Sequence, residues 1–164
     1  IMAYLRFSLN VLAEHDMAQL HFWREQFLAE KLDAMWLPKA EALLQKHRDQ
    51  GHTLMIITAT NDFVTAPLAD RLGVDHLIAT VAECKRERYT GNVAGIPSYR
   101  DGKVERLAEW LRANNESLAG SWFYSDSHND LPLLRKVDNP VAVDPDATLD
   151  REAREQGWPV ISLR

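Results

Sequence analysis

Cysteine is almost missing from this chain of 164 residues, which contains Cys84 and no other. A lone cysteine cannot form an internal disulfide, so the sequence favours a reducing, cytoplasmic setting. The six histidines are scattered, and none stands at a zinc-finger spacing from Cys84, which argues against a structural zinc site. No stretch approaches the roughly 20 apolar residues that a membrane span needs, and no signal peptide opens the chain.

Positive charge is also scarce, since 19 Lys and Arg residues stand against 24 Asp and Glu residues and the formal net charge is −5. Nucleic acids and anionic membranes attract basic patches, so the composition argues against both as partners. One short basic run, at residues 85–88, is interpreted as the solvated turn of a hairpin. The length suits one domain with a real core.

The first third of the chain is predicted to be helical, because its apolar residues recur at spacings of three and four over 3–14 and 16–32. Asp16 is a plausible N-cap of the second helix. A third helix is predicted over 38–50, since Pro38 stands near its first turn and Gly51 follows its end. One face of the second helix carries Leu20, Trp23, Phe27 and Leu28.

The spacing of the apolar residues changes at Thr53. The run "TLMIIT" is short, apolar and β-branched, as is typical of a buried parallel strand. Strands and helices then alternate, which predicts an α/β fold with a doubly wound, Rossmann-like parallel sheet. Asp62 is a possible N-cap of the first of these helices and Gly73 its C-terminal stop. The elements predicted after this strand are a helix at 62–73, a strand at 76–80, a hairpin at 84–93, a helix at 102–115, a strand at 121–125, a short helix at 131–137, a strand at 140–144, a helix at 146–157 and a strand at 159–163.

Thr58 ends the first predicted strand, and polar residues follow it directly. Ligands of doubly wound sheets bind beyond the carboxyl ends of the strands. The Thr58 hydroxyl, with the backbone N–H groups of Ala59 and Thr60, can hold an oxyanion there. The alternative is that Thr58, Asn61 and Asp62 only cap the following helix.

A second polar segment, "SDSHND", stands at the end of the strand at 121–125. Asp126 and Asp130 are four residues apart in one loop and repel each other unless a cation lies near. Hard oxygen ligands of this kind suit Mg²⁺. The alternative is that Asp130 is the N-cap of the next short helix and Asp126 a turn residue, and His128 is either a proton donor or an exposed loop histidine.

Lys103 stands in the first turn of the helix at 102–115, where the helix dipole mildly disfavours a cation. A nearby anion would reverse that preference, although many surface lysines violate it.

The order of these groups resembles the haloacid dehalogenase superfamily of phosphohydrolases. "IIT", ending at Thr58, is similar to its second motif, Lys103 in "GKVERL" to its third, and "SDSHNDLPLL" to its fourth. The fourth is close to the pattern of the phosphoserine-phosphatase branch. "AYLRFSL", "LPKA" and "YTGNVAG" further suggest subfamily IB, whose members are phosphoserine-phosphatase-like or histidinol-phosphatase-like.

The resemblance implies a phosphomonoester hydrolase that uses Mg²⁺ and an aspartyl-phosphate intermediate. It implies that Asp126 and Asp130 hold the metal, that Thr58 binds the phosphoryl oxygens and that Lys103 offsets charge. Asp130 would also orient Lys103, which makes Thr58, Lys103 and Asp130 the catalytic residues of this chain. The residues expected to bind substrate are Thr58, Ala59, Asn129 and Arg6.

The resemblance also implies two parts, a partial α-helical cap at 1–37 and an α/β core at 38–164 with a small hairpin near 82–94. The family's first motif, Asp-x-Asp, does not occur in its expected form. Its nucleophile, the first strand and the start of the cap are therefore expected upstream of Ile1, and the chain by itself is expected to be inactive.

The expected partner is a small phosphorylated metabolite, with phosphoserine and histidinol phosphate both open and the oligomeric state undetermined. A non-catalytic phospho-ligand-binding module of the same fold is the alternative. A receiver-type signalling domain has its acidic residues first and its lysine last, which is the wrong order. A dinucleotide-binding domain would need a glycine-rich turn that "TATND" lacks.

Overall fold

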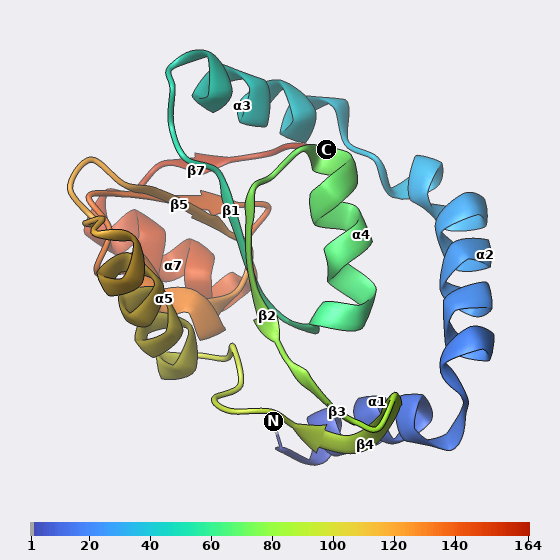
Figure 1. Cartoon of the computed structure of the whole chain (residues 1–164). Helices are drawn as coiled ribbons and strands as arrows, with labels where there is room; N and C mark the ends of the chain where they lie inside the picture. The colour runs from blue at the N-terminus through green and yellow to red at the C-terminus, as the bar shows by residue number, and fades with distance from the viewer. Residues whose placement is uncertain (1) are drawn as a thin grey trace.

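The computed structural model describes residues 2–164 and has the mixed α/β architecture that the sequence predicts. Figure 1 shows its elements in chain order. The helices are α1 (Met2–Glu14), α2 (Met17–Met35), α3 (Pro38–Asp49), α4 (Asp62–Leu72), α5 (Asp101–Asn114), the 3₁₀ turn η1 (His128–Asp130), α6 (Leu131–Leu134) and α7 (Ala147–Gln156). The strands are β1 (Met55–Asn61), β2 (His76–Thr80), β3 (Ala82–Lys85), β4 (Arg88–Val93), β5 (Trp122–Ser125), β6 (Asn139–Val143) and β7 (Val160–Ile161).

The parallel strands form two separate groups. β1 pairs with β2, and β6 pairs with both β5 and β7, in every case parallel. In Figure 1, α4 and α5 lie on opposite sides of β1 and β2, which is the doubly wound arrangement. The carboxyl ends of these strands therefore define the edge at which a ligand is expected.

Two buried clusters hold the strands and helices together, and α6 contributes to both. Ile78 of β2, Leu107 of α5 and Leu133 of α6 form one buried cluster. Leu134, Ala142 and Leu149 belong to a second cluster that joins α6, β6 and α7, and these three are fully buried. The loop between β5 and α6 is thus held between two cores, which keeps its backbone in place.

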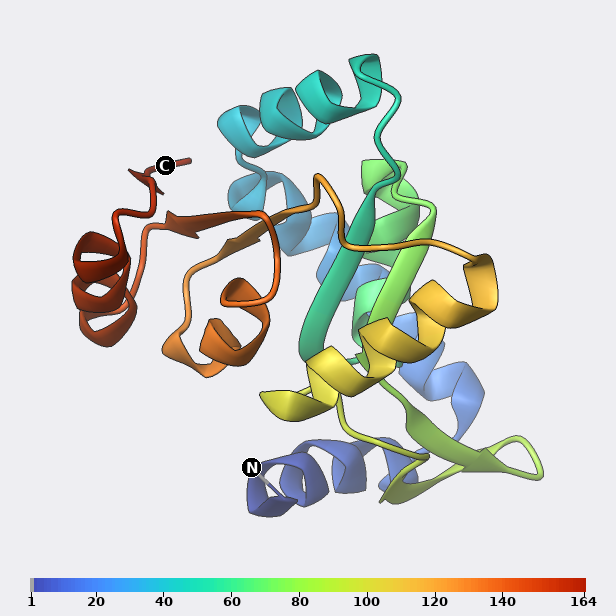
Figure 2. The same ribbon diagram turned by 90° about the vertical axis from the view of Figure 1, so that its left-hand side faces the viewer.

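The antiparallel hairpin β3–β4 follows β2 directly and packs against α1, as Figure 2 also shows. Leu9, Leu12 and Leu20 form a buried cluster there with Phe63 of α4 and Ala82 of β3. No helix among the described residues is long and apolar enough to cross a membrane. The basic run at 85–88 forms the turn of the hairpin, as predicted.

Four local expectations need correction. β1 continues past Thr58, so the side chain that caps α4 is Asn61, which accepts a hydrogen bond from Val64 N, and not Asp62. The helix after Asp130 ends at Leu134 instead of residue 137, and the last strand spans only two residues.

On α2 only Leu20 of the expected apolar face is buried, whereas Trp23 and Phe27 are 42% and 44% exposed. The cap of α2 is Asp16, as predicted, since it accepts a hydrogen bond from Gln19 N.

Candidate active site

A buried ion pair joins α5 to the loop after β5. Lys103 Nζ lies 2.6 Å from Asp130 Oδ1, and each side chain is only 8% exposed. The other carboxylate oxygen of Asp130 accepts a hydrogen bond of 2.7 Å from Ser125 Oγ at the end of β5. Asp130 does occupy the N-cap position of α6, but its side chain makes no capping hydrogen bond there and binds Lys103 and Ser125 instead.

The pair lies at a cavity of about 400 Å³ at the carboxyl ends of the parallel strands. Thr58 from β1, and Ser125 and Asp126 from the end of β5, also contribute to its wall. The predicted residues Thr58, Lys103, Asp126 and Asp130 are therefore brought to one cavity, although up to 72 residues separate them in the sequence.

The cavity lies between two unpaired strand edges. Within residues 2–164, β1 pairs only with β2, and β5 pairs only with β6. Ile57 and Thr58 line the cavity from the β1 side, and Tyr124 and Ser125 line it from the β5 side. Parallel sheets are normally covered on both faces, so their strands are buried. The apolar run of β1 is nevertheless only half-buried. The free backbone groups of both edges can pair with one further strand.

The backbone after Thr58 differs from the expected oxyanion site in one respect. The N–H of Thr60 donates to Thr58 Oγ1 at 3.1 Å, so it is already used. The pairing of β1 with β2 is irregular between Ile57 and Asn61, which places Ala59 outside the regular ladder. The Thr58 hydroxyl remains able to donate its own proton to a ligand oxygen.

Three of the expected substrate-binding residues, Ala59, Asn129 and Arg6, lie outside this cavity's lining. Asn129 Oδ1 accepts hydrogen bonds from Tyr99 Oη at 2.8 Å and Arg100 Nε at 3.1 Å, and its amide nitrogen donates to Ser127 Oγ at 3.1 Å. The side chain thereby ties the loop after β5 to the segment before α5. Arg6 instead lines a second cavity, between α1 and the hairpin.

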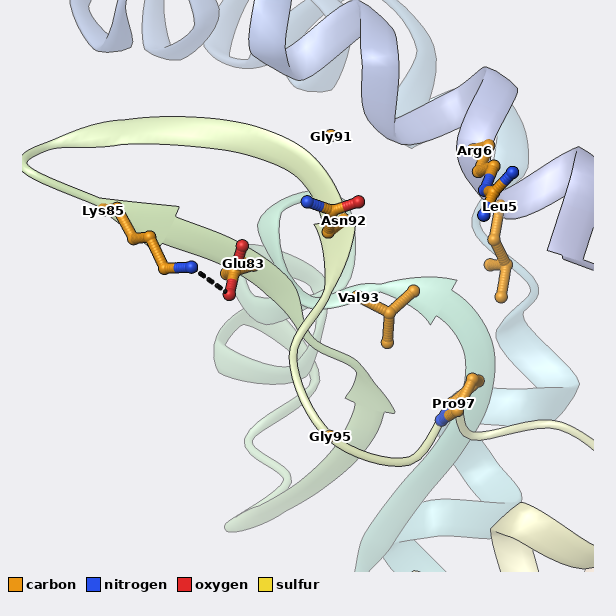
Figure 3. Close-up of a pocket in the computed structure, with 9 residues that line it drawn as sticks. All are labelled: Leu5, Arg6, Glu83, Lys85, Gly91, Asn92, Val93, Gly95 and Pro97. Carbon is orange, nitrogen blue, oxygen red and sulfur yellow. Dashed lines mark ion pairs between the residues drawn. The ribbon is translucent and has the colours of Figure 1, made fainter.

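This second cavity has a volume of about 460 Å³ (Figure 3). Glu83 and Lys85 on its wall form an ion pair of 2.8 Å, and Glu83 also accepts a hydrogen bond from Thr90. The hydrogen bonds from Lys85 and Thr90 lower the pKa of Glu83, so it stays ionised. Arg6, Leu5 and Asn92 line other parts of the same wall.

Asp144 is a cavity residue that the sequence analysis missed. It lines the 400 Å³ cavity and accepts a hydrogen bond from Leu163 N at 3.1 Å. Hydrogen bonds from Ser162 and Leu163 lower the pKa of its carboxyl group. The sequence carries a sign of this role, because Asp144 directly follows a buried strand, as Asp126 does. The sequence-based prediction instead places Asp144 inside the strand at 140–144.

His128 interacts with Asp146, which is the N-cap of α7. The Asp146 carboxylate accepts hydrogen bonds from His128 N at 2.7 Å and from Leu149 N at 2.9 Å, and it lies 2.9 Å from His128 Nδ1. Burial acts to raise the pKa of Asp146, but these hydrogen bonds outweigh it and lower the pKa to about 2. Through its contacts with Asp146, His128 therefore links the loop after β5 to the start of α7.

Tyr124 is supported from behind the cavity by a pair of histidines. Buried His47 of α3 lies 2.8 Å from Tyr124 Oη through Nε2 and 2.8 Å from His52 Nδ1 through its own Nδ1. Of the two facing Nδ1 atoms only one can carry a hydrogen, because two N–H groups that point at each other would repel. Burial, followed by the charges of His52 and Lys46, lowers the pKa of His47.

Acidification is accordingly expected to destabilise the fold through His47. The unfolded chain titrates near the ordinary histidine value of about 6.5 and the folded chain below it, so the unfolded state binds more protons. This contribution to stability is complete above pH of about 6.5 and declines as the pH falls below that value. Urea unfolding midpoints at pH 8, 7, 6 and 5 should fall less in His47→Gln than in the unsubstituted protein. His21→Gln, at an exposed position, serves as the control, and equal pH dependence in all three proteins would contradict this assignment.

The cavity suits a divalent cation that shares its coordination with a substrate. Asp126 is exposed in it and has no ion-pair partner among the described residues, and Asp144 is the next carboxylate. Mg²⁺ commonly takes one or two carboxylates and completes its shell with water and phosphate oxygens. Across residues 2–164 no group of three or more His, Cys, Asp or Glu side chains is arranged to hold a metal alone. The donor set fits Mg²⁺ in that shared mode.

Comparison with known proteins defines the class. The family model for haloacid dehalogenase-like hydrolases matches residues 2–135. The histidinol-phosphatase of Neisseria meningitidis serogroup C is 41% identical over 166 residues, and the match covers 99% of this chain and 75% of that protein. The chain belongs to the haloacid dehalogenase-like hydrolase family.

Other relatives are longer than this chain. The phosphoserine phosphatase SerB1 of Mycobacterium tuberculosis is 34% identical over 160 residues, a match that covers 97% of this chain and 52% of that protein. A protein of unknown function from Bordetella pertussis Tohama I superposes with a TM-score of 0.96 at 40% identity, over 99% of this chain and 74% of that one. A substrate-bound phosphoserine phosphatase, at 18% identity and a TM-score of 0.59 over 76% of this chain and 57% of that chain, shares the fold. The chain thus spans about three quarters of the meningococcal relative and about half of the mycobacterial one.

Proposed function

We propose that this chain supplies most of a Mg²⁺-dependent phosphatase that hydrolyses a small phosphorylated metabolite in the cytoplasm. The observation that carries the proposal is the buried Lys103–Asp130 pair beside exposed Asp126, in a cavity at the carboxyl ends of the parallel strands. A fixed cation, a hydroxyl and a free carboxylate in one cavity can bind a phosphoryl group and a metal ion, as phosphoryl transfer requires. The names of the relatives support the same activity.

Each residue has a proposed role. The Thr58 hydroxyl donates to a phosphoryl oxygen, and Lys103 offsets the charge that the phosphoryl group and the nucleophile bring together. Asp130, held by Ser125, keeps Lys103 aimed into the cavity. Asp126 holds Mg²⁺, with Asp130 or Asp144 as the neighbouring carboxylate, and the metal when bound supplies further neutralisation of phosphoryl charge. The hydrogen bonds of Asn129 favour an indirect role in substrate binding.

The nucleophile is proposed to come from a segment outside the described residues. Such a segment would pair with the free edges of β1 and β5 and join the two strand groups into one sheet. A carboxylate at the carboxyl end of this strand would reach the cavity, take the phosphoryl group and release it to water. Residues 1–37 are proposed as part of a cap and 38–164 as the core, with the hairpin at 82–94 working with α1, against which it packs.

The test uses the full-length gene product, including any residues that precede Ile1. Phosphate release is measured from an aryl phosphate and a panel of small phosphomonoesters, in Mg²⁺ and in EDTA. Turnover that depends on Mg²⁺ supports the proposal. A folded protein that binds inorganic phosphate by calorimetry but hydrolyses none of the panel would instead be a phospho-ligand-binding module.

A further inference from the structure

Helix α4 contains a proline in its interior, Pro67, and this residue frees a carbonyl group. A carbonyl inside an α-helix normally accepts a hydrogen bond from the N–H group four residues later, and proline has no N–H group. The carbonyl of Phe63 therefore lacks its partner within the helix. Phe63 is a buried residue, and a buried carbonyl without a partner destabilises the fold.

Arg24 of α2 supplies the missing hydrogen bond. Its Nη1 donates to the carbonyl oxygen of Phe63 at 3.0 Å, and its guanidinium carbon lies 4.6 Å from the centre of the Phe63 ring. Its Nη2 lies 2.9 Å from Nδ1 of His21, which belongs to α2 itself. One side chain of α2 thus binds both the backbone and the ring of one residue of α4, which fixes the two helices relative to each other.

Few other contacts hold α2 in place. Of its 19 residues only Leu20 and Leu32 are buried. Its second polar link to α4 is the ion pair of Asp33 with Arg71 at 2.9 Å, in which the side chains are 88% and 51% exposed. An ion pair this exposed contributes little, because water and salt screen it. The link made by Arg24, whose side chain is only 17% exposed, is therefore the main polar attachment of α2 to α4.

The same link can be released at a small net cost. The carboxylate that pairs with Arg24 is that of Glu25 at 3.7 Å, which is 69% exposed, so no buried anion holds the guanidinium. Its Nε is buried and has no hydrogen-bond partner among the described residues. A cation buried with one N–H unpaired regains hydration when it returns to water. This gain offsets part of what the carbonyl and the ring contribute.

We propose that Arg24 is a reversible latch: it holds α2 on α4 by replacing the N–H group that Pro67 lacks, and α2 moves away from α4 when this contact opens. In Figure 1, α1 and the hairpin lie beyond the carboxyl ends of β1 and β2, and α2 connects α1 with α3. Opening of the latch therefore lets the helical segment move at the edge of the sheet where a ligand is expected.

The test is a double-mutant cycle of Arg24→Met and Pro67→Ala in the full-length protein, measured by amide hydrogen exchange in α2. Alone, Arg24→Met leaves the Phe63 carbonyl unpaired and should speed exchange in α2 by about 10–100-fold. In Pro67→Ala the N–H group of residue 67 can bond to that carbonyl. Adding Arg24→Met to Pro67→Ala should then speed exchange by about fivefold or less, which is the loss of the contact with the ring.

Two controls accompany the cycle. Lys31→Met removes an exposed cation from the same helix and should leave exchange in α2 within about twofold of the unsubstituted protein. The amides of β6 and α7 belong to the other strand group and report on the whole fold, so their exchange should be unchanged in every variant.

Equal acceleration by Arg24→Met with and without Pro67→Ala would overturn the proposal, because the freed carbonyl would then not be what Arg24 holds. Unchanged exchange in α2 would overturn it too. So would faster exchange throughout β6 and α7, since Arg24 would then support the whole fold and not one helix. The measurement needs no substrate, so absence of turnover would count against the phosphatase function alone.

Discussion

Asp126→Asn is expected to abolish Mg²⁺-dependent phosphate release and leave the fold intact. Asp126 is exposed in the cavity and has no ion-pair partner among residues 2–164, so its charge does not hold the structure together. A neutral amide is a much poorer ligand for a hard cation. Loss of a group that merely supports a metal ligand costs about 10–100-fold in affinity or activity, and loss of the ligand itself should cost more.

The measurement is phosphate release by the full-length enzyme across a series of Mg²⁺ concentrations, together with the thermal unfolding midpoint. Asp75→Asn is the matched control, because Asp75 is exposed just before β2, at the amino end of the sheet and away from the cavity. Retained turnover in Asp126→Asn would remove the metal assignment. An unfolded Asp126→Asn protein would show that the residue is structural.

Lys103→Met is expected to reduce both activity and stability. Removing one partner of a buried ion pair leaves the other charge uncompensated, which typically costs about 3–5 kcal/mol of unfolding free energy. Asp130 would keep only the hydrogen bond from Ser125 in a site that is 8% exposed. Loss of a fixed positive group at the phosphoryl site should also lower kcat by about 10²–10³-fold.

A double variant separates these two effects. In Lys103→Met/Asp130→Asn no buried charge remains, and Ser125 can still donate to the amide oxygen, so most of the lost stability should return in urea unfolding. Activity should not return, because the cation is still missing. If the double variant were as unstable as Lys103→Met, packing of the lysine stem and not charge would explain the loss.

The element order was predictable from the sequence because each strand and helix carries a local signal. The run before Thr58 is apolar and β-branched, and Pro38 begins α3 as expected. The boundaries were less certain, since β1 continues through polar residues as far as Asn61. A chain can extend a strand past its apolar run wherever backbone partners are available, and β2 provides one at Thr80.

The candidate site was predictable in part. Thr58 and Asp126 were selected because polar residues directly follow buried strands, and the structure brings both to one cavity. Asp144 carries the same signal and was missed, because it was counted within its strand.

The sequence by itself determined which residue types stand at the ends of the strands, and thus the α/β class and the resemblance to phosphohydrolases. Only the tertiary structure decided what each of them does. Asp130 could cap α6 or bind a distant cation with equal local plausibility, and the choice depends on α5, which delivers Lys103 to 2.6 Å from its carboxylate. The physical reason is that periodicity and capping act over a few residues, whereas ion pairs and cavities form between elements that only packing brings together.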